Sequence, residues 1–349
     1  MNQKIIGIVI LIVVVIVGVI IGTMSPGGFN KNEVVVSGYV GGEKIGFFED
    51  QKVQDILKKK YNIVADDIRA GSYEMMDLDT SDKDFLFPSS QVALEIYKGK
   101  NAAGIKQAER VFQSPIVLYS WTDIAKALEA KGIARSAPGG YYTVDMFKLL
   151  EYVKNGASWS ELGVDLYGKV KVLCTDPNKS NSGNMYAGMV YQILTDNNYP
   201  RAEAMNTLNS MIKNIGFMET SSGTLFESYL IKGKGANPLV IGYENQIIEF
   251  ALENPEVWNK AKGNVAILVP EPTVWSEHPV IALTDNGKLL IEALLDKEIQ
   301  EIAWKNHGFR YPSFQSIENE VIALPESLDK IIEMPSVQEM QEIMSMLSQ

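Results

Sequence analysis

The feature that most constrains the fold is an order of segments that recurs along the chain: an apolar run, a polar turn, then a segment with helical spacing. In "KVKVLCTDPNKSNSGNMYAG", residues 169–188, an alternating run precedes a turn rich in Ser and Asn, and Met185 and Met189 follow at helical spacing. The stretch "PLVIGYENQIIEF", residues 238–250, repeats the order. Strands that alternate with helices predict an α/β body with mostly parallel sheets.

The polar turns themselves point to a ligand site. Five of them follow predicted strands and lead towards helices: "SGYVGGEK", "AGSYEM", "FPSSQ", "TDPNKSNSGN" and "GYENQ". Helix N-termini carry unpaired N–H groups and about half a positive charge, and open α/β sheets bind ligands beyond the carboxyl ends of their strands. Each turn alone is explained by helix capping, but together they predict one cleft that receives an oxygen-rich ligand.

Length and composition exclude several classes. A chain of 349 residues exceeds the size of a single growing core, so two lobes are expected. The net charge of −11 argues against nucleic acid, whose binding needs basic surface. The single cysteine, Cys174, rules out an intrachain disulfide framework or a cysteine-rich zinc site and reads as a buried filler. No HExxH, GxSxG, CxxC or Walker lysine arrangement occurs, so no enzyme, cofactor or metal is predicted.

The N-terminus predicts a membrane anchor. Residues 5–22 form an 18-residue run without a charged or polar side chain, just long enough to cross a bilayer, and Lys4 precedes it. A cleaved secretory signal is the alternative, but the apolar stretch is long and no small-x-small cleavage site is evident. We therefore predict an uncleaved single-pass anchor in the cell membrane, with the body on the extracellular side.

Three motifs carry a resemblance to a known family. They are "TDPNKSNSGNM" (residues 175–185), "GYENQ" and "PEPTVWSEHP" (residues 270–279). From about Val34 to Phe309 the chain resembles bacterial extracellular solute-binding proteins of the type II periplasmic-binding fold, in the group that carries these motifs. The resemblance implies two α/β lobes joined by hinge segments, with the ligand enclosed between them. The wider superfamily binds molybdate, sulfate, phosphate, ferric ion and sugars.

The resemblance also implies a division of the chain. Residues 1–31 would be the anchor and tether, 32–119 the first part of lobe one, 120–278 lobe two, and 279–349 the rest of lobe one with the C-terminal helices. The hinge crossings are predicted near residues 119–121 and 277–279.

The candidate ligand-binding residues come from the polar turns and their neighbours, and the ligand class stays open. Lys44 and the hydroxyl and amide groups suit an oxyanion, whereas Glu244 would suit a cation, an amine or a sugar hydroxyl unless it caps its own helix. Trp121 either stacks on an organic ligand or packs in a core. The candidates are Gly42, Lys44, Ser72, Ser89, Ser90, Trp121, Ser180, Ser182, Gly183, Asn184, Tyr243 and Glu244.

The sequence thus predicts a monomeric, membrane-tethered solute receptor that encloses an oxyanion or another small polar solute and hands it to the permease of an ABC importer. An envelope sensor or a scaffold on the same fold is the alternative, and an enzyme on this fold is less favoured.

Overall fold

A computed structural model describes residues 33–311 and 328–349. The predicted anchor lies outside these residues. Within them, none of the helices combines the length and the apolar character needed to cross a bilayer.

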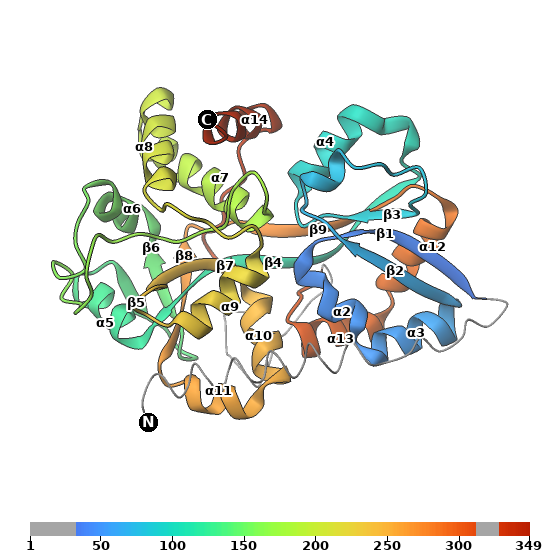
Figure 1. The fold of residues 1–349 in the computed structure, drawn as a ribbon, viewed down its shortest axis with the longest axis horizontal. Helices are drawn as coiled ribbons and strands as arrows, with labels where there is room; N and C mark the ends of the chain where they lie inside the picture. The colour runs from blue at the N-terminus through green and yellow to red at the C-terminus, as the bar shows by residue number, and fades with distance from the viewer. Residues whose placement is uncertain (1–32, 312–327) are drawn as a thin grey trace.

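Two β-sheets form the backbones of two lobes that lie side by side (Figure 1). The first sheet has the order β2-β1-β3-β9-β4, and the second joins β7, β4, β8, β6 and β5. The strands are β1 (Val34–Val40), β2 (Ile63–Arg69), β3 (Phe85–Phe87), β4 (Gln107–Trp121), β5 (Ala134–Ser136), β6 (Tyr142–Asp145), β7 (Leu239–Tyr243), β8 (Val265–Glu271) and β9 (Trp275–Ala282).

Strand β4 belongs to both sheets and so carries the chain from one lobe to the other. Its first part pairs with β9 as far as Pro115, and from Ile116 onward it pairs with β7. Pro115 has no N–H to extend the ladder. The return runs through the segment between β8, which ends at Glu271, and β9. The chain therefore passes between the lobes at residues 115–116 and again between residues 271 and 275.

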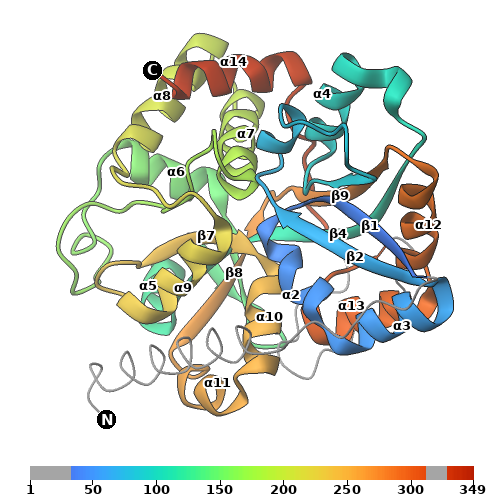
Figure 2. The same ribbon diagram turned by 45° about the vertical axis from the view of Figure 1, so that its right-hand side comes forward.

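Helices cover the faces of both sheets (Figure 2). Capping side chains fix many of their starts: Ser90 accepts from the N–H of Ala93, and Asp145 accepts from that of Lys148. The helices are α2 (Ile45–Glu49), α3 (Gln51–Tyr61), α4 (Gln91–Asn101), α5 (Thr122–Ala130), α6 (Met146–Lys154), α7 (Asn181–Asp196), α8 (Arg201–Lys213), α9 (Ser222–Lys232), α10 (Glu244–Glu253), α11 (Pro255–Ala261), α12 (Asp285–Leu294), α13 (Lys297–His307) and α14 (Val337–Leu347), with short 3-10 helices η1 (Gly42–Lys44), η2 (Glu74–Met76) and η3 (Ala102–Gly104).

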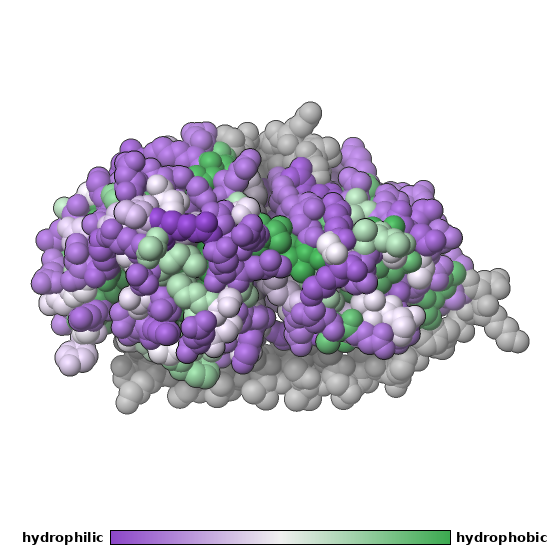
Figure 3. All heavy atoms as spheres, turned by 90° about the horizontal axis from the view of Figure 1, so that it is seen from above, coloured by the Kyte–Doolittle hydropathy of each residue, from purple (hydrophilic) through white to green (hydrophobic). Residues whose placement is uncertain are grey.

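Each lobe has its own hydrophobic core. Phe47, Phe112 and Phe309 pack together in lobe one, whereas Ile116 and Leu118 of the same β4 belong to the core of lobe two. Seen from above, the surface is mostly hydrophilic, and hydrophobic residues show in the middle (Figure 3). Because Phe112 of β4 packs in the core of lobe one and Ile116 and Leu118 pack in the core of lobe two, each lobe has a separate core and β4 joins them.

Three sequence predictions need correction. The run "KVKVL" forms only two isolated bridges, Lys169 to Ser158 and Leu173 to Val240, although Val170, Val172 and Cys174 are buried in alternation as a strand would bury them. The sheets are mixed rather than mostly parallel, because the crossing strands β4 and β9 run antiparallel to their neighbours. The C-terminal helices are predicted to complete lobe one, but helix α14 packs on α7 and α8 of lobe two and also contacts α4 of lobe one.

Candidate functional site

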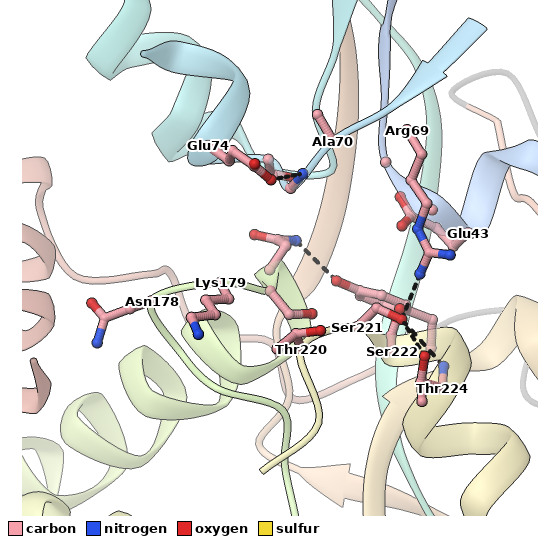
Figure 4. A pocket seen from close by; sticks show the side chains of 17 residues that line it. Glu43, Arg69, Ala70, Glu74, Asn178, Lys179, Thr220, Ser221, Ser222 and Thr224 are labelled. Atoms are coloured by element: carbon pink, nitrogen blue, oxygen red, sulfur yellow. Dashed lines mark hydrogen bonds between the residues drawn. The ribbon is translucent and has the colours of Figure 1, made fainter. Parts of the chain in front are cut away.

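A cavity of about 720 Å³ lies between the lobes. Lobe one supplies residues 41–43, 69–72 and 74, and lobe two supplies residues 178–181, 220–222, 224 and 243. Figure 4 shows these side chains converging from both sides. The volume falls within the range of about 300–1,000 Å³ typical of sites for small organic ligands.

The walls are built from strand ends and helix starts. Residues 41–43 follow β1 and begin η1, residues 69–72 end β2, and Tyr243 ends β7. Ser180 is the N-cap residue of helix α7, and its side chain makes no capping hydrogen bond. Ser221 is the N-cap residue of helix α9. The cavity is thus faced by the first turns of two long helices, where N–H groups and the positive ends of the helix dipoles are found.

Arg69 is the cation that reaches across the cavity. Its Nη2 donates to Ser221 Oγ at 2.6 Å, so the hydrogen bond joins lobe one to lobe two (Figure 4). No carboxylate among the described residues lies within ion-pair distance of the guanidinium. Gly42 makes room for it, because a Cβ there would lie 2.8 Å from Arg69 Nε.

Glu43 lines the cavity as an ionised carboxylate. Burial raises its pKa, but the ammonium of Lys44, with further help from Ser89, outweighs burial and holds the pKa at about 2. Lys44 Nζ donates to Glu43 Oε1 and, at 2.6 Å, to Ser89 Oγ. The buried pair is therefore neutral overall.

Behind this pair lies His278, which is fully buried and uncharged. Burial, followed by the charge of Lys44, lowers its pKa well below the ordinary value. Its Nδ1 is 3.3 Å from Lys44 Nζ, and its Nε2 is 3.0 Å from Ser276 Oγ. Burial also lowers the pKa of Lys44, and Glu43 opposes that shift. The floor of the cavity is thus a hydrogen-bonded network that holds Glu43 in place.

Asn181, the first residue of α7, ties lobe two to this floor. Its Nδ2 donates to Ser89 O at 2.6 Å and to the Tyr243 hydroxyl at 3.0 Å. Its Oδ1 is buried and accepts no hydrogen bond from the described residues. Because the donors fix the orientation of the amide, the acceptor cannot be exchanged for the donor by a flip.

The two lobes touch at further points around the cavity. The Tyr73 hydroxyl of lobe one donates to Asn184 Oδ1 at 2.5 Å. Gly71 approaches the backbone of lobe two so closely that a Cβ would lie 2.6 Å from Lys179 O. The structure therefore shows the lobes in contact, with the cavity between them.

Four of the twelve predicted residues line the cavity: Gly42, Ser72, Ser180 and Tyr243. Lys44 and Ser89 lie in the floor beneath it. The sequence could place these residues because each sits in a turn at a strand end.

The other six predicted residues do not line the cavity and have structural partners. Ser90 caps α4, Ser182 Oγ lies 2.9 Å from Thr175 Oγ1, and Gly183 N–H donates to Thr175 Oγ1. Asn184 binds Tyr73 and the sulfur of Met344.

Trp121 and Glu244 differ most from their predicted role as ligand-binding residues. The Trp121 indole donates to Asn237 O at 2.9 Å and packs on Tyr229, so Trp121 belongs to the lobe-two core. Glu244 is fully buried and forms a two-pronged ion pair with Arg310.

Sequence reasoning missed three parts of the cavity lining: Arg69, residues 220–224 and Asn181. Arg69 gave no signal beyond being the last residue of a strand. Residues 220–224, "TSSGT", carry the same small polar pattern before a helix as "SNSG" does, so this signal was available. Asn181 sits inside the quoted turn but was not singled out.

Comparison with known proteins shows the fold. No family model and no curated protein matches the chain. Among solved structures, a periplasmic thiamin binding protein matches with a TM-score of 0.61 at 13% identity, over 93% of this chain and 98% of that one. The periplasmic binding protein P5PA matches with a TM-score of 0.55 at 14% identity, over 90% and 98% of the two chains. The sulfate-binding protein SubI from Mycobacterium tuberculosis H37Rv matches with a TM-score of 0.51 at 13% identity, over 80% and 87%. The chain therefore has the two-lobe fold of periplasmic binding proteins.

Proposed function

We propose that the protein is an extracellular solute-binding protein that closes two lobes over a small polar ligand and delivers it to an ABC importer. One observation carries the proposal: the cavity takes its walls from both lobes, so a ligand there contacts both only when they close. Such a ligand shifts the hinge equilibrium towards the closed form. The similarity in fold to periplasmic binding proteins supports this function.

The polar lining of the cavity supports binding of a small polar solute. Its described lining includes several serine and threonine hydroxyls, but none of them is hydrogen-bonded to a histidine or a lysine. A nucleophile with an adjacent base is therefore absent from the described lining. The apolar run at residues 5–22 supports a membrane tether.

Thermal unfolding of the full-length protein in detergent, with oxyanions, sugars, amino acids and metal ions as probes, tests the binding step. A ligand at 100 times its dissociation constant stabilises the folded state by about 2.7 kcal/mol. Thr224 is exposed at the cavity, so Thr224→Trp should occlude the site and abolish the shift, whereas Lys126→Trp on the remote helix α5 should not. A shift that survives Thr224→Trp unchanged would contradict binding in this cavity.

Uptake of the identified ligand by cells that lack this chain tests the delivery step. Loss of uptake is expected for an importer component. Normal uptake together with intact binding would instead assign the protein to sensing.

A further inference from the structure

The cavity lining includes a cation and two acceptor oxygens that accept no hydrogen bond from the described residues, and together they restrict the ligand. The cation is Arg69. A guanidinium has five N–H donors, and one of them is occupied by Ser221 Oγ. Arg69 lies beside the start of α9, whose dipole also favours negative charge. This side of the cavity suits an anionic group.

The first acceptor is Asn181 Oδ1. Asn181 is 5% exposed and lines the cavity, and its Oδ1 has no hydrogen-bond partner among the described residues. Its Nδ2 is held by Ser89 O and Tyr243, so the oxygen cannot turn away. The large majority of buried polar side-chain atoms in folded proteins have a hydrogen-bond partner, and because Asn181 lines the cavity, a donor group of a ligand can be the partner here.

The second acceptor is Glu43 Oε2. The hydrogen bonds that Lys44 and Ser89 donate to Glu43 both go to Oε1, and Glu43 lines the cavity. Oε2 is therefore the oxygen left for a ligand. Because Lys44 balances the charge of Glu43, a neutral hydroxyl and an ammonium are both acceptable donors at this position.

We infer that the ligand is a small organic anion that also carries hydrogen-bond donors, either hydroxyl or amino groups, and that its anionic group lies at Arg69 while its donors bind Glu43 and Asn181. This inference rests on the proposed function and names its ligand class. A fully deprotonated inorganic oxyanion such as sulfate has no proton to donate, so its oxygens would face the two acceptors unfavourably. Sulfate is also too small to fill a cavity of about 720 Å³.

Matched pairs of probes test the inference by calorimetry on the full-length protein in detergent. Glycerol 3-phosphate is compared with propyl phosphate, phosphoethanolamine with ethyl phosphate, and glycerate with propionate; sulfate is the donor-free inorganic probe. In at least one pair the donor-bearing member should bind tenfold tighter or more, because a site built to bond a donor rejects the analogue that lacks it. The hydroxyl and amino pairs show which donor is preferred.

Glu43→Gln gives the sharpest readout. Because Lys44 and Ser89 hold the amide oxygen, the new NH2 replaces Oε2 and turns the acceptor into a donor. The preference for the donor-bearing probe should then disappear or reverse, with propyl phosphate or sulfate binding tighter than to the wild type. A merely structural effect would weaken both members of a pair equally. Arg69→Gln should weaken the binding of every anion, whereas Lys126→Gln on the remote helix α5 should change anion binding little.

The outcomes test the ligand class separately from the proposed function. Equal binding of both members of every pair, or an unchanged preference in Glu43→Gln, overturns the ligand class. Saturable binding of neutral sugars or cations without any anion also overturns it but keeps the proposed function. Absence of a saturable ligand in the whole panel overturns both.

Discussion

The buried pair of Glu244 and Arg310 allows a prediction that separates a structural role from a ligand role. Arg310 Nε donates to Glu244 Oε2 at 2.7 Å and Nη2 donates to Oε1 at 2.5 Å, with the two side chains 2% and 0% exposed. The guanidinium also lies over the rings of Trp275 and Trp304. Glu244→Gln removes the negative charge and turns one acceptor into a donor that faces the guanidinium.

The expected cost follows from burial. Breaking a buried ion pair by removing one partner costs about 3–5 kcal/mol. For roughly 300 residues the entropy of unfolding is about 0.6 kcal/mol per kelvin. The melting temperature of Glu244→Gln should therefore fall by about 5–8 °C.

Differential scanning calorimetry measures this fall, and two further variants control it. Glu342→Gln breaks the exposed pair with Arg201 and should lower the melting temperature by less than about 2 °C. Glu244→Gln combined with Arg310→Met removes both charges and should recover part of the loss. If Glu244→Gln melts within about 2 °C of the wild type but no longer binds ligand, the structural assignment of Glu244 is refuted.

Two further predictions concern closure and pH. Gly71→Ala places a Cβ 2.6 Å from Lys179 O, so overpacking of about 1–3 kcal/mol in the closed form should weaken ligand binding by about 5- to 150-fold. Gly99→Ala is the control, because a Cβ there has no atom within 4 Å and should leave the affinity unchanged. If calorimetry gives equal affinities for Gly71→Ala and the wild type, the lobes do not meet at Gly71. Burial lowers the pKa of His307, but Glu249 and Asp50 outweigh it and raise the pKa above the ordinary value. Its stabilisation is therefore complete below about pH 6.5 and lost as the pH rises through the raised value, and Glu253, whose pKa burial raises to about 7, acts in the same direction. His278, whose pKa is lowered, acts in the opposite direction in both proteins. Urea unfolding should therefore show that the stability of the wild type falls more, or rises less, from pH 6 to 8 than that of His307→Gln; an equal slope would contradict this origin.

The sequence predicted the α/β class because it rests on local patterns, and it predicted two lobes because of its length. Strand and helix periodicity is set by neighbours within a few residues, and the length alone demands two cores. The pairing partners of β4 depend on segments more than a hundred residues away, so the mixed sheet and the positions of the crossings could not be read from the run itself. The position of α14 against both lobes is likewise a tertiary choice.

The turn "SNSGN" was predicted to bind ligand, but its sequence does not determine which of its side chains face the cavity. A helix turns by about 100° per residue, so one first turn can direct only part of its side chains into a cavity. Ser180 and Asn181 face the cavity, whereas Ser182 faces Thr175 and Asn184 faces Tyr73 and Met344. Composition marks the turn as polar without fixing this rotation. The same turn therefore supplies both a wall of the cavity and the hydrogen bonds that hold the wall in place, and only the packing of α7 decides which residue does which.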